Sequence, residues 1–469
     1  MKDVLVVPKY VIETYSVLKE SGYEAFLVGG AVRDALTGKE PHDWDIATNA
    51  TPEQVQEIFS ETFYENEFGT VGVVSKNLVD GSEMSWVVEV TTYRTQEEYE
   101  DFRRPILEKM NWGKTILEDL GRRDFTVNAI ALAVETTNLD LNQDLVKVPQ
   151  HSLRVTDPFG GMEDLDKKLL RAVGNPSERF QEDALRMMRA VRFFAQLDFL
   201  IEVETLAAIR TKKSNLVHIS AERVKEELWK ILASERAYEG LEMLDEVGLL
   251  DYMLPELTAG KKLMQRGHHI HDVFTHSMLA LKNCPSKDPL VRFAALLHDI
   301  GKVPTHVERD GVNTFYNHDM VGAKMAREIA YRFKLSKKER EKLFMLVRWH
   351  MFSVDTVQTD AAVRRFIRKV GVENIEDMID IRIGDRLGSG TKDAEGWRLR
   401  EFKRRIETLL MPTFTVKDLV INGHDVMQIL QIPPSRKVGE ILEALFQEVL
   451  DDPGKNTAEY LSNRVRELI

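Results

Sequence analysis

The segment FLVGGAVRDALTGKEPHDWDIAT, residues 26–48, constrains the fold more than any other part of the chain. It opens with a short apolar run, reaches the pair Gly29-Gly30, and continues into a helical pattern that we expect to begin at Ala31. Glycine lets the backbone approach an anion closely, and the N-terminus of a helix offers free N–H groups. Arg33 adds a permanent positive charge. This order predicts a strand, a turn and a helix that together bind a phosphate group.

Two aspartates close the same segment. In a strand, Asp43 and Asp45 would project from one face and Trp44 from the other. Two hard oxygen ligands beside a phosphate site suit Mg²⁺. The alternative is a turn beside an Asp-capped helix, which explains the residues singly but not their order after the glycine pair. The segment therefore indicates metal-assisted chemistry on a nucleoside triphosphate.

Bulk properties limit the classes of protein to which the chain can belong. With 469 residues it exceeds one core, so several domains are expected. The single cysteine, Cys284, excludes an internal disulfide and a thiolate zinc site, as in a cytosolic protein. The start MKDVLVVPKY is too short for a signal peptide, and no apolar run approaches the ~20 residues that span a bilayer. A net charge of −12 argues against an indiscriminate binder of long RNA, so any basic surface must be local.

Residues 1–150 alternate helical and strand patterns, and the pattern is almost wholly helical from about residue 176. Thr51, Pro52 and Gln54 form a helix start with a capping box. We further expect a helix over 8–22, a strand over 24–28, strands over 71–76 and 85–92 joined as a hairpin, and a loop over 94–118.

Two further stretches carry charges that suit this chemistry. Glu89, between Val88 and Val90, is either a third carboxylate at the metal or an edge-strand residue facing water. In GRRDFTVNA, residues 121–129, we expect a loop entering a helix capped by Asp124. There Arg122 and Arg123 could clamp a triphosphate.

The segment RFQEDALRMMRAVRF, residues 179–193, is expected to place Asp183 and Arg186 one turn apart on a single helix face. Cytosine and adenine both present an amino donor beside a ring-nitrogen acceptor. A carboxylate and a guanidinium complement that pattern, whereas guanine and uracil reverse both groups. The alternative is an ordinary surface ion pair, which is common and worth little. Arg189 and Arg192 rotate progressively off that face.

Taken in order, GGAVRD, DWD, EVTTYR, YEDFRRP, RRDFTVNA, DPFGGMEDL and EDALRMMRAVRF resemble the motifs of the class II tRNA nucleotidyltransferases. These are the CCA-adding enzymes and bacterial poly(A) polymerases, within the DNA polymerase beta superfamily. The resemblance covers roughly the first half of the chain. It implies two-metal, Mg²⁺-dependent catalysis by Asp43 and Asp45. Glu89 remains the candidate third carboxylate from its own sequence context. The segment YEDFRRP, residues 99–105, resembles the flexible loop that the family needs to add the terminal A.

The resemblance also implies residues that bind the nucleotide. Asp183 and Arg186 would be an amino-acid template for CTP and ATP. The remaining expected nucleotide contacts are Gly29, Gly30, Arg33, Arg123, Arg189 and Arg192.

Eight of the twelve histidines fall between His268 and His350. THSMLAL, AALLHDIGK and IRIGDRLG supply His276, His298-Asp299 and Asp385, and they resemble the H…HD…D site of HD-superfamily phosphohydrolases. That resemblance implies a bound divalent ion, a transition metal or Mg²⁺. His318 and His350 could serve a second metal or be core or solvated histidines. We interpret a further pair, His424-Asp425, as structural.

The favoured hypothesis is a cytoplasmic enzyme that adds CCA to the 3′ end of tRNA from CTP and ATP, with no membrane and no obligate protein partner. Alternatives within the class are an A-adding specialist and a poly(A) polymerase. An alternative of another class is an HD-type metal-dependent phosphohydrolase acting on RNA ends or nucleotides, for instance on 2′,3′-cyclic phosphates. A pure RNA-binding module is disfavoured, because carboxylates beside a phosphate loop would repel RNA unless a metal intervened.

The expected fold is an α+β nucleotidyltransferase head, DNA polymerase beta-like with a small mixed sheet, followed by all-α regions. The expected domains are a catalytic head at 1–150, a neck with the template helix at 151–215, a helical RNA-binding body at 216–262, an HD domain at 263–390 and a helical, tRNA-binding tail at 391–469.

Overall fold

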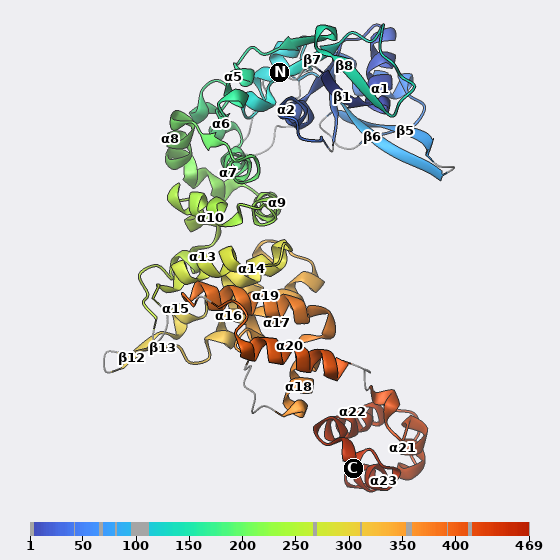
Figure 1. Cartoon of the computed structure of the whole chain (residues 1–469), viewed down its shortest axis with the longest axis vertical. Coiled ribbons are helices and arrows are strands. Elements are labelled where there is room, and N and C mark those ends of the chain that lie inside the picture. The colour runs from blue at the N-terminus through green and yellow to red at the C-terminus, as the bar shows by residue number, and fades with distance from the viewer. Residues whose placement is uncertain are drawn as a thin grey trace. The chain divides into compact units, whose positions relative to one another are not determined.

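The chain divides into two units, Met1–Pro255 and Glu256–Ile469, each described here by itself (Figure 1). The computed structural model describes residues 4–41, 43–64, 69–79, 82–94, 112–265, 270–309, 312–352, 359–391, 393–410 and 415–468. The expected order, a mixed sheet first and helices afterwards, is confirmed.

A seven-stranded sheet organises the first unit, in the order β4-β5-β6-β3-β2-β7-β9. Only β3 and β6 pair in parallel, and the other neighbours are antiparallel. A separate antiparallel pair joins β1 to β8. The strands are β1 (Val4–Pro8), β2 (Ala25–Val28), β3 (Asp45–Thr48), β4 (Thr62–Tyr64), β5 (Thr70–Val79), β6 (Ser82–Thr92), β7 (Ala131–Val134), β8 (Leu145–Pro149) and β9 (Leu153–Thr156).

Helices connect these strands, and the chain after β9 is mostly helical. Those among the strands are α1 (Lys9–Glu20), α2 (Gly29–Thr37), α3 (Pro52–Ile58), α4 (Ile116–Gly121) and α5 (Gly161–Asp166). The helical part of this unit holds α6 (Pro176–Glu182), α7 (Leu185–Leu197), α8 (Val203–Lys212), α9 (Ala221–Leu232), α10 (Ala237–Glu246) and α11 (Leu250–Met253). A two-stranded parallel pair joins β10 (Leu169–Leu170), which precedes α6, to β11 (Leu200–Ile201), which follows α7.

Local sequence signals explain several of these elements. Thr51 caps α3 in a capping box with Gln54, as expected, and Pro52 occupies the first helical position. The predicted hairpin is confirmed, and Figure 1 shows β5 and β6 as long strands extending from the sheet. β9 lies beyond the predicted head boundary at residue 150 and pairs with β7 at the edge of the sheet. The other predicted boundaries remain predictions.

The second unit is mostly helical. Its helices are α12 (Pro255–Thr258, which starts at the division), α13 (Val273–Asn283), α14 (Pro289–Leu297), α15 (Lys302–Thr305), α16 (His318–Arg332), α17 (Lys337–Trp349), α18 (Asp360–Val370), α19 (Ile375–Gly388), α20 (Trp397–Leu410), α21 (Gly423–Leu430), α22 (Arg436–Asp451) and α23 (Ala458–Glu467). A small hairpin, β12 (Val307–Arg309) with β13 (Val312–Thr314), interrupts them.

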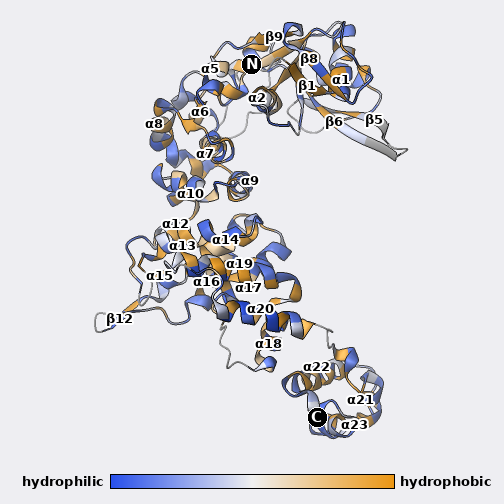
Figure 2. Ribbon diagram, viewed as in Figure 1, coloured by the Kyte–Doolittle hydropathy of each residue, from blue (hydrophilic) through white to orange (hydrophobic). Residues whose placement is uncertain are grey.

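Burial follows the apolar pattern in this unit. Figure 2 colours α14 mostly as hydrophobic, and all but its first residue are buried. Every residue of α14 except Arg292 is apolar, and Arg292 is itself buried, so α14 lies in the core. The helices α21, α22 and α23 enclose an apolar cluster of their own around Leu445 and Leu461. Within the described ranges, no helix has both the length and the apolar content needed to cross a bilayer.

Candidate functional site

A cleft of about 1020 Å³ in the first unit collects every residue predicted for nucleotide chemistry. The strands and α2 supply one part of the lining, and α7 supplies another. The predicted residues that line it are Gly29, Gly30, Arg33, Asp43, Asp45, Glu89, Arg123, Asp183, Arg186, Arg189 and Arg192. Segments more than 140 residues apart in sequence are therefore brought to one site.

The carboxylates meet where the two parallel strands lie side by side. Asp45 is the register partner of Glu89 across β3 and β6. Because β6 lies between β5 and β3, the edge-strand alternative for Glu89 is wrong. The expectation that a strand also holds Asp43 is wrong as well, since β3 begins at Asp45. Asp43 still reaches the same cleft, and Trp44 is buried at 2% exposure.

The glycine pair allows the turn to approach these carboxylates. Gly29 has φ +79°, and a Cβ there would lie 2.7 Å from Asp45 Oδ2 and 3.4 Å from a terminal nitrogen of Arg123. Any larger residue would be strained and would collide with the acid. The helix begins at Gly29 rather than at Ala31 as expected. On it, Arg33 is buried and donates to Asn128 Oδ1 at 2.7 Å.

Two buried carboxylates, Asp119 and Asp124, form ion pairs with arginines at the cleft. Arg122 and Arg123 both pair with Asp119, at 3.2 and 3.1 Å. Asp124 accepts from Arg189 at 2.6 Å. Burial alone would raise the pKa of Asp124, but Arg189 and the neighbouring hydrogen bonds lower it to about 2.

The helix predicted after Asp124 is instead a single 3₁₀ turn, Thr126–Asn128, which the Asp124 side chain does not cap. Asp124 Oδ1 accepts instead from the backbone N–H of Phe125 and from the side-chain amide of Asn128. The segment therefore holds its arginines at the cleft through side-chain contacts rather than on a helix.

The two template candidates do not share a helix. Asp183 directly follows α6, which ends at Glu182, and α7 begins at Leu185, so the expected common helix face is wrong. Both side chains nevertheless line the cleft. Asp183 Oδ1 accepts from the Leu185 N–H at 3.0 Å, and Oδ2 accepts from Arg223 at 2.6 Å.

Arg186 is held from several sides. It donates to Glu182 and to the backbone carbonyls of Arg179 and Arg122. Arg192 pairs with Glu227 at 3.1 Å. The template candidates and Arg192 are thus oriented by partners that local sequence patterns did not reveal.

The oxygen-rich end of the cleft fits a hard divalent ion. It offers three carboxylates beside a glycine turn, and such ligands are the ones that Mg²⁺ shares with substrate phosphates. The arginine-lined wall has the charge to bind the phosphates themselves. The segment YEDFRRP lies outside the described residues.

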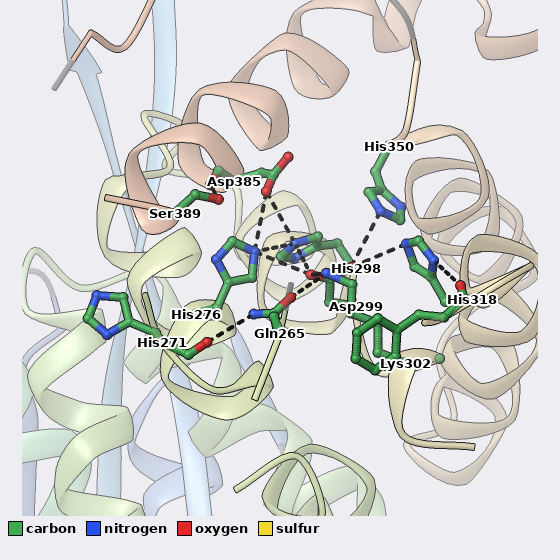
Figure 3. Close-up of polar contacts among 12 residues, drawn as sticks. Gln265, His271, His276, His298, Asp299, Lys302, His318, His350, Asp385 and Ser389 are labelled. Carbon is green, nitrogen blue, oxygen red and sulfur yellow. Dashed lines mark hydrogen bonds and ion pairs between the residues drawn. The ribbon is translucent and has the colours of Figure 1, made fainter. Parts of the chain in front are cut away.

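A second cluster lies in the other unit (Figure 3). His276 on α13, the pair His298-Asp299 after α14, and Asp385 on α19 converge. The Nε2 atoms of His276 and His298 are 3.1 Å apart, and they lie 3.3 and 3.1 Å from Asp299 Oδ2. Asp385 Oδ1 is 3.3 Å from His276 Nε2. Two imidazole nitrogens and two carboxylate oxygens meeting in a buried place fit a divalent metal ion.

Burial and charge set the protonation of this cluster. Burial alone would lower the pKa of His276, but the hydrogen bonds to Asp299 and Asp385 raise it to about 9. The pKa of Asp385 lies far below its usual range despite burial, because His276 and His298 face it. Burial lowers the pKa of His350 to about 4, which leaves this imidazole neutral at pH 7.

Sequence reasoning missed three residues of this second site, Lys302, Arg382 and Arg386. His318 and His350, whose roles were left open, both line the adjoining pocket of about 600 Å³. Lys302 places Nζ 2.6 Å from Asp299 Oδ2, and its position three residues after Asp299 in HDIGK is a signal that could have found it. Arg382 and Arg386 line the same pocket.

Comparison with known proteins agrees with this layout. Three family models match: the poly A polymerase head domain over 25–171, the probable RNA and SrmB-binding site of polymerase A over 198–261, and the HD domain over 266–387. The CCA-adding enzyme of Geobacillus stearothermophilus is 32% identical over 457 residues, which is 96% of this chain and 96% of that protein. The chain belongs to the CCA-adding enzyme family.

Other members show how far the similarity reaches. The CCA-adding enzyme of Geobacillus thermodenitrificans is 44% identical over 250 residues, 53% of this chain and 55% of that protein. In this alignment the chain spans only about half the length of its CCA-adding relative. The crystal structure of the Bacillus stearothermophilus CCA-adding enzyme in complex with CTP is 29% identical, covers 98% of both chains and superposes with a TM-score of 0.67. The resemblance and the fold class inferred from sequence are confirmed by these matches.

Proposed function

We propose that the chain adds C, C and A in turn to the 3′ end of tRNA, using CTP, ATP and Mg²⁺, in the cytoplasm. The observation that carries this proposal is the single cleft, which holds three carboxylates near a glycine turn together with Asp183, between α6 and α7, and Arg186 on α7. Membership in the CCA-adding family and the likeness to a CTP-bound structure support it.

Each part of the cleft has a role in the proposal. Asp43 and Asp45, with Glu89 beside them, hold Mg²⁺, which when bound activates the primer hydroxyl and neutralises the triphosphate. Arg33, Arg123, Arg189 and Arg192 contribute charge for the phosphates.

Asp183 and Arg186 select the base in this proposal. A carboxylate accepts from the exocyclic amino group of cytosine or adenine, and a guanidinium donates to the ring nitrogen. Both groups are already fixed by Arg223, Glu182 and backbone carbonyls, which is the preorganisation that selection needs.

The test uses tRNA transcripts that end before, within and after CC, each offered one nucleoside triphosphate at a time. The proposal expects C on the first two ends, A only after CC, and no extension with GTP or UTP. An A-adding specialist would extend only the transcript ending in CC, and a poly(A) polymerase would continue past one A. Asp45→Asn should slow addition by about 10³-fold or more. Asp166→Asn, at an exposed acid on α5, is the matched control.

A second candidate function belongs to the other unit, where the metal-binding geometry adjoins a pocket. We infer a metal-dependent phosphohydrolase that acts on phosphate esters of nucleotides or RNA ends. Lys302, Arg382 and Arg386 line that pocket and suit an anionic substrate. The test is release of phosphate from nucleoside 2′- or 3′-phosphates, or opening of 2′,3′-cyclic phosphates, without any triphosphate. Activity lost in His276→Ala and retained in Asp45→Asn would support it.

A further inference from the structure

Three arginines of the nucleotide cleft meet at one phenylalanine ring. The centroid of the Phe193 ring, on α7, lies 4.2 Å from the guanidinium carbon of Arg192 and 5.5 Å from that of Arg189. The guanidinium carbon of Arg33, on α2, is 5.2 Å from the same centroid. These distances fall within the ~6 Å at which the face of an aromatic ring attracts a cation. Phe193 lines the cleft together with all three arginines.

The three positive charges lie close together in a confined place. Each arginine has a carboxylate partner, in the pairs Arg33–Asp34, Arg189–Asp124 and Arg192–Glu227. Even so, burial and then the charge of Arg189 lower the pKa of Arg192 to about 10. The Nε atom of Arg192 is buried and has no hydrogen-bond partner within the described ranges. Like charges repel more strongly away from bulk water, so a further attraction is needed to hold these groups side by side.

The Phe193 ring is fixed well enough to supply that attraction. Its side chain is buried, and the ring meets that of Phe125 edge to face, with centroids 5.8 Å apart and planes at 87°. Arg189 precedes Phe193 by one helical turn, so the two side chains share a face of α7. A leucine would fill part of the same space but has no aromatic quadrupole to attract a cation. Apolar volume alone therefore does not account for a phenylalanine at this position.

We propose that the Phe193 ring positions Arg33, Arg189 and Arg192 to bind the triphosphate. The inference rests on the proposed nucleotide addition. The ring attracts each guanidinium and lowers the cost of gathering three like charges before the substrate arrives. Guanidinium groups that are fixed in advance lose less conformational freedom when a phosphate binds. Phe193 acts through the arginines and is a positioning residue rather than a catalytic one.

A phenylalanine in a nucleotide cleft could instead stack on the base. The two roles affect different parts of the substrate. Stacking adds affinity only for a ligand that carries a base, whereas positioned arginines add affinity for the phosphates whether a base is attached or not. Inorganic pyrophosphate has no base and therefore separates the two roles.

The test replaces Phe193 in the full chain by phenylalanines that carry one, two or three fluorine atoms on the ring. Fluorine changes the size of the ring little and progressively weakens its negative face. Dissociation constants for CTP and for pyrophosphate, each with Mg²⁺ and without tRNA, are measured by titration calorimetry. We expect both constants to rise steadily with the number of fluorines, by about tenfold at three. Phe193→Leu should weaken binding at least as much.

Phe194 is the matched control. It is the next residue on α7, it is buried, and its ring centroid lies 4.8 Å from the guanidinium carbon of Arg236. Phe194 is absent from the described residues that line the cleft. The same fluorinated residues at position 194 should leave both dissociation constants unchanged, which separates an effect at the cleft from a general effect on stability.

Two results would overturn the inference while leaving the proposed function intact. The first is equal CTP affinity across the Phe193 series. The second is pyrophosphate that fails to bind, or binds every variant equally while CTP binding weakens, because the ring would then act on the base. A parent protein that bound no CTP would instead overturn the proposed function, and the inference with it.

Discussion

Asp45 and Glu89 are register partners on the only parallel pair of strands in the described seven-stranded sheet. This pairing places a carboxylate from β6 next to the acids of the DWD segment. We predict that Glu89→Gln, which removes the charge and keeps the shape, lowers kcat for C and A addition by about 10²- to 10³-fold. Single-turnover assays on tRNA transcripts measure this directly. Asp43 is expected to behave in the same way.

The control for this prediction is Glu57→Gln, at an exposed acid on α3 in the same unit. It should leave the rate unchanged. Raising Mg²⁺ should partly restore Glu89→Gln, because a weaker ion site is filled by mass action. A Glu89→Gln enzyme with the parental rate would show that this carboxylate takes no part in addition.

We predict that Arg223 positions Asp183 for the proposed base selection. It donates to Asp183 Oδ2 at 2.6 Å from a helix 40 residues further along the chain. We predict that Arg223→Ala loosens Asp183 and lowers discrimination against GTP and UTP by about tenfold, roughly 1.4 kcal/mol. Asp183→Asn, which reverses part of the donor pattern, should lower it further.

The measurement is the ratio of kcat/KM for CTP to that for UTP on a transcript ending before CC. Arg223→Lys keeps the charge and should restore part of the selectivity. A variant that merely weakened the fold would lower both rates equally and leave the ratio unchanged. An unchanged ratio in Arg223→Ala would therefore refute the positioning role.

Local patterns in the sequence were enough to predict several of the helices and strands. The capping box at Thr51, the hairpin of β5 and β6, and His298 at the end of an apolar helix all depend on neighbours a few residues away. Such short-range signals are read directly from composition and spacing. The residues gathered in the cleft were predicted from motif order, which reflects contacts that a single segment does not show.

Some of the errors depended on partners that are distant along the chain. Whether Glu89 lies on an edge strand is decided by the strand order, which places β3 beside β6. Asp183 falls between two helices, where its carboxylate accepts from Arg223, 40 residues further along the chain. One carboxylate oxygen of Asp299 faces His276 and His298, and the other faces His318 and His350. The second contact requires α16 and α17 to be folded against Asp299. No periodicity within one segment carries this information.

Cys284 is expected to be inert in the folded protein. The thiol is buried, and burial raises its pKa to about 12. The thiolate is the reactive form, so at pH 8 only about one molecule in 10⁴ carries it.

We predict that a disulfide reagent modifies this single cysteine at least 10³-fold more slowly in native protein than in denaturant. Lys287→Cys, an exposed position in the same loop, should supply a fast-reacting thiol as the control. Rapid modification of the native parent would contradict the buried placement.

The ion pair of Asp124 and Arg189 makes stability depend on pH. The pKa of Asp124 is about 2 in the folded chain and about 3.9 in an unfolded one, so the stabilisation is fully present above pH 4. It is lost as the pH falls from about 4 to about 2, and it amounts to roughly 2–3 kcal/mol.

Asp124→Asn removes the charge and leaves Arg189 without its partner, so it should cost about 3 kcal/mol at pH 7. Calorimetric melting at pH 7, 5, 4 and 3 would show a large difference in Tm between parent and variant at neutral pH that narrows only below pH 4. Asp166→Asn, at an exposed acid, should show no such narrowing. A difference that stayed constant down to pH 3 would mean that Asp124 contributes through shape rather than through its charge.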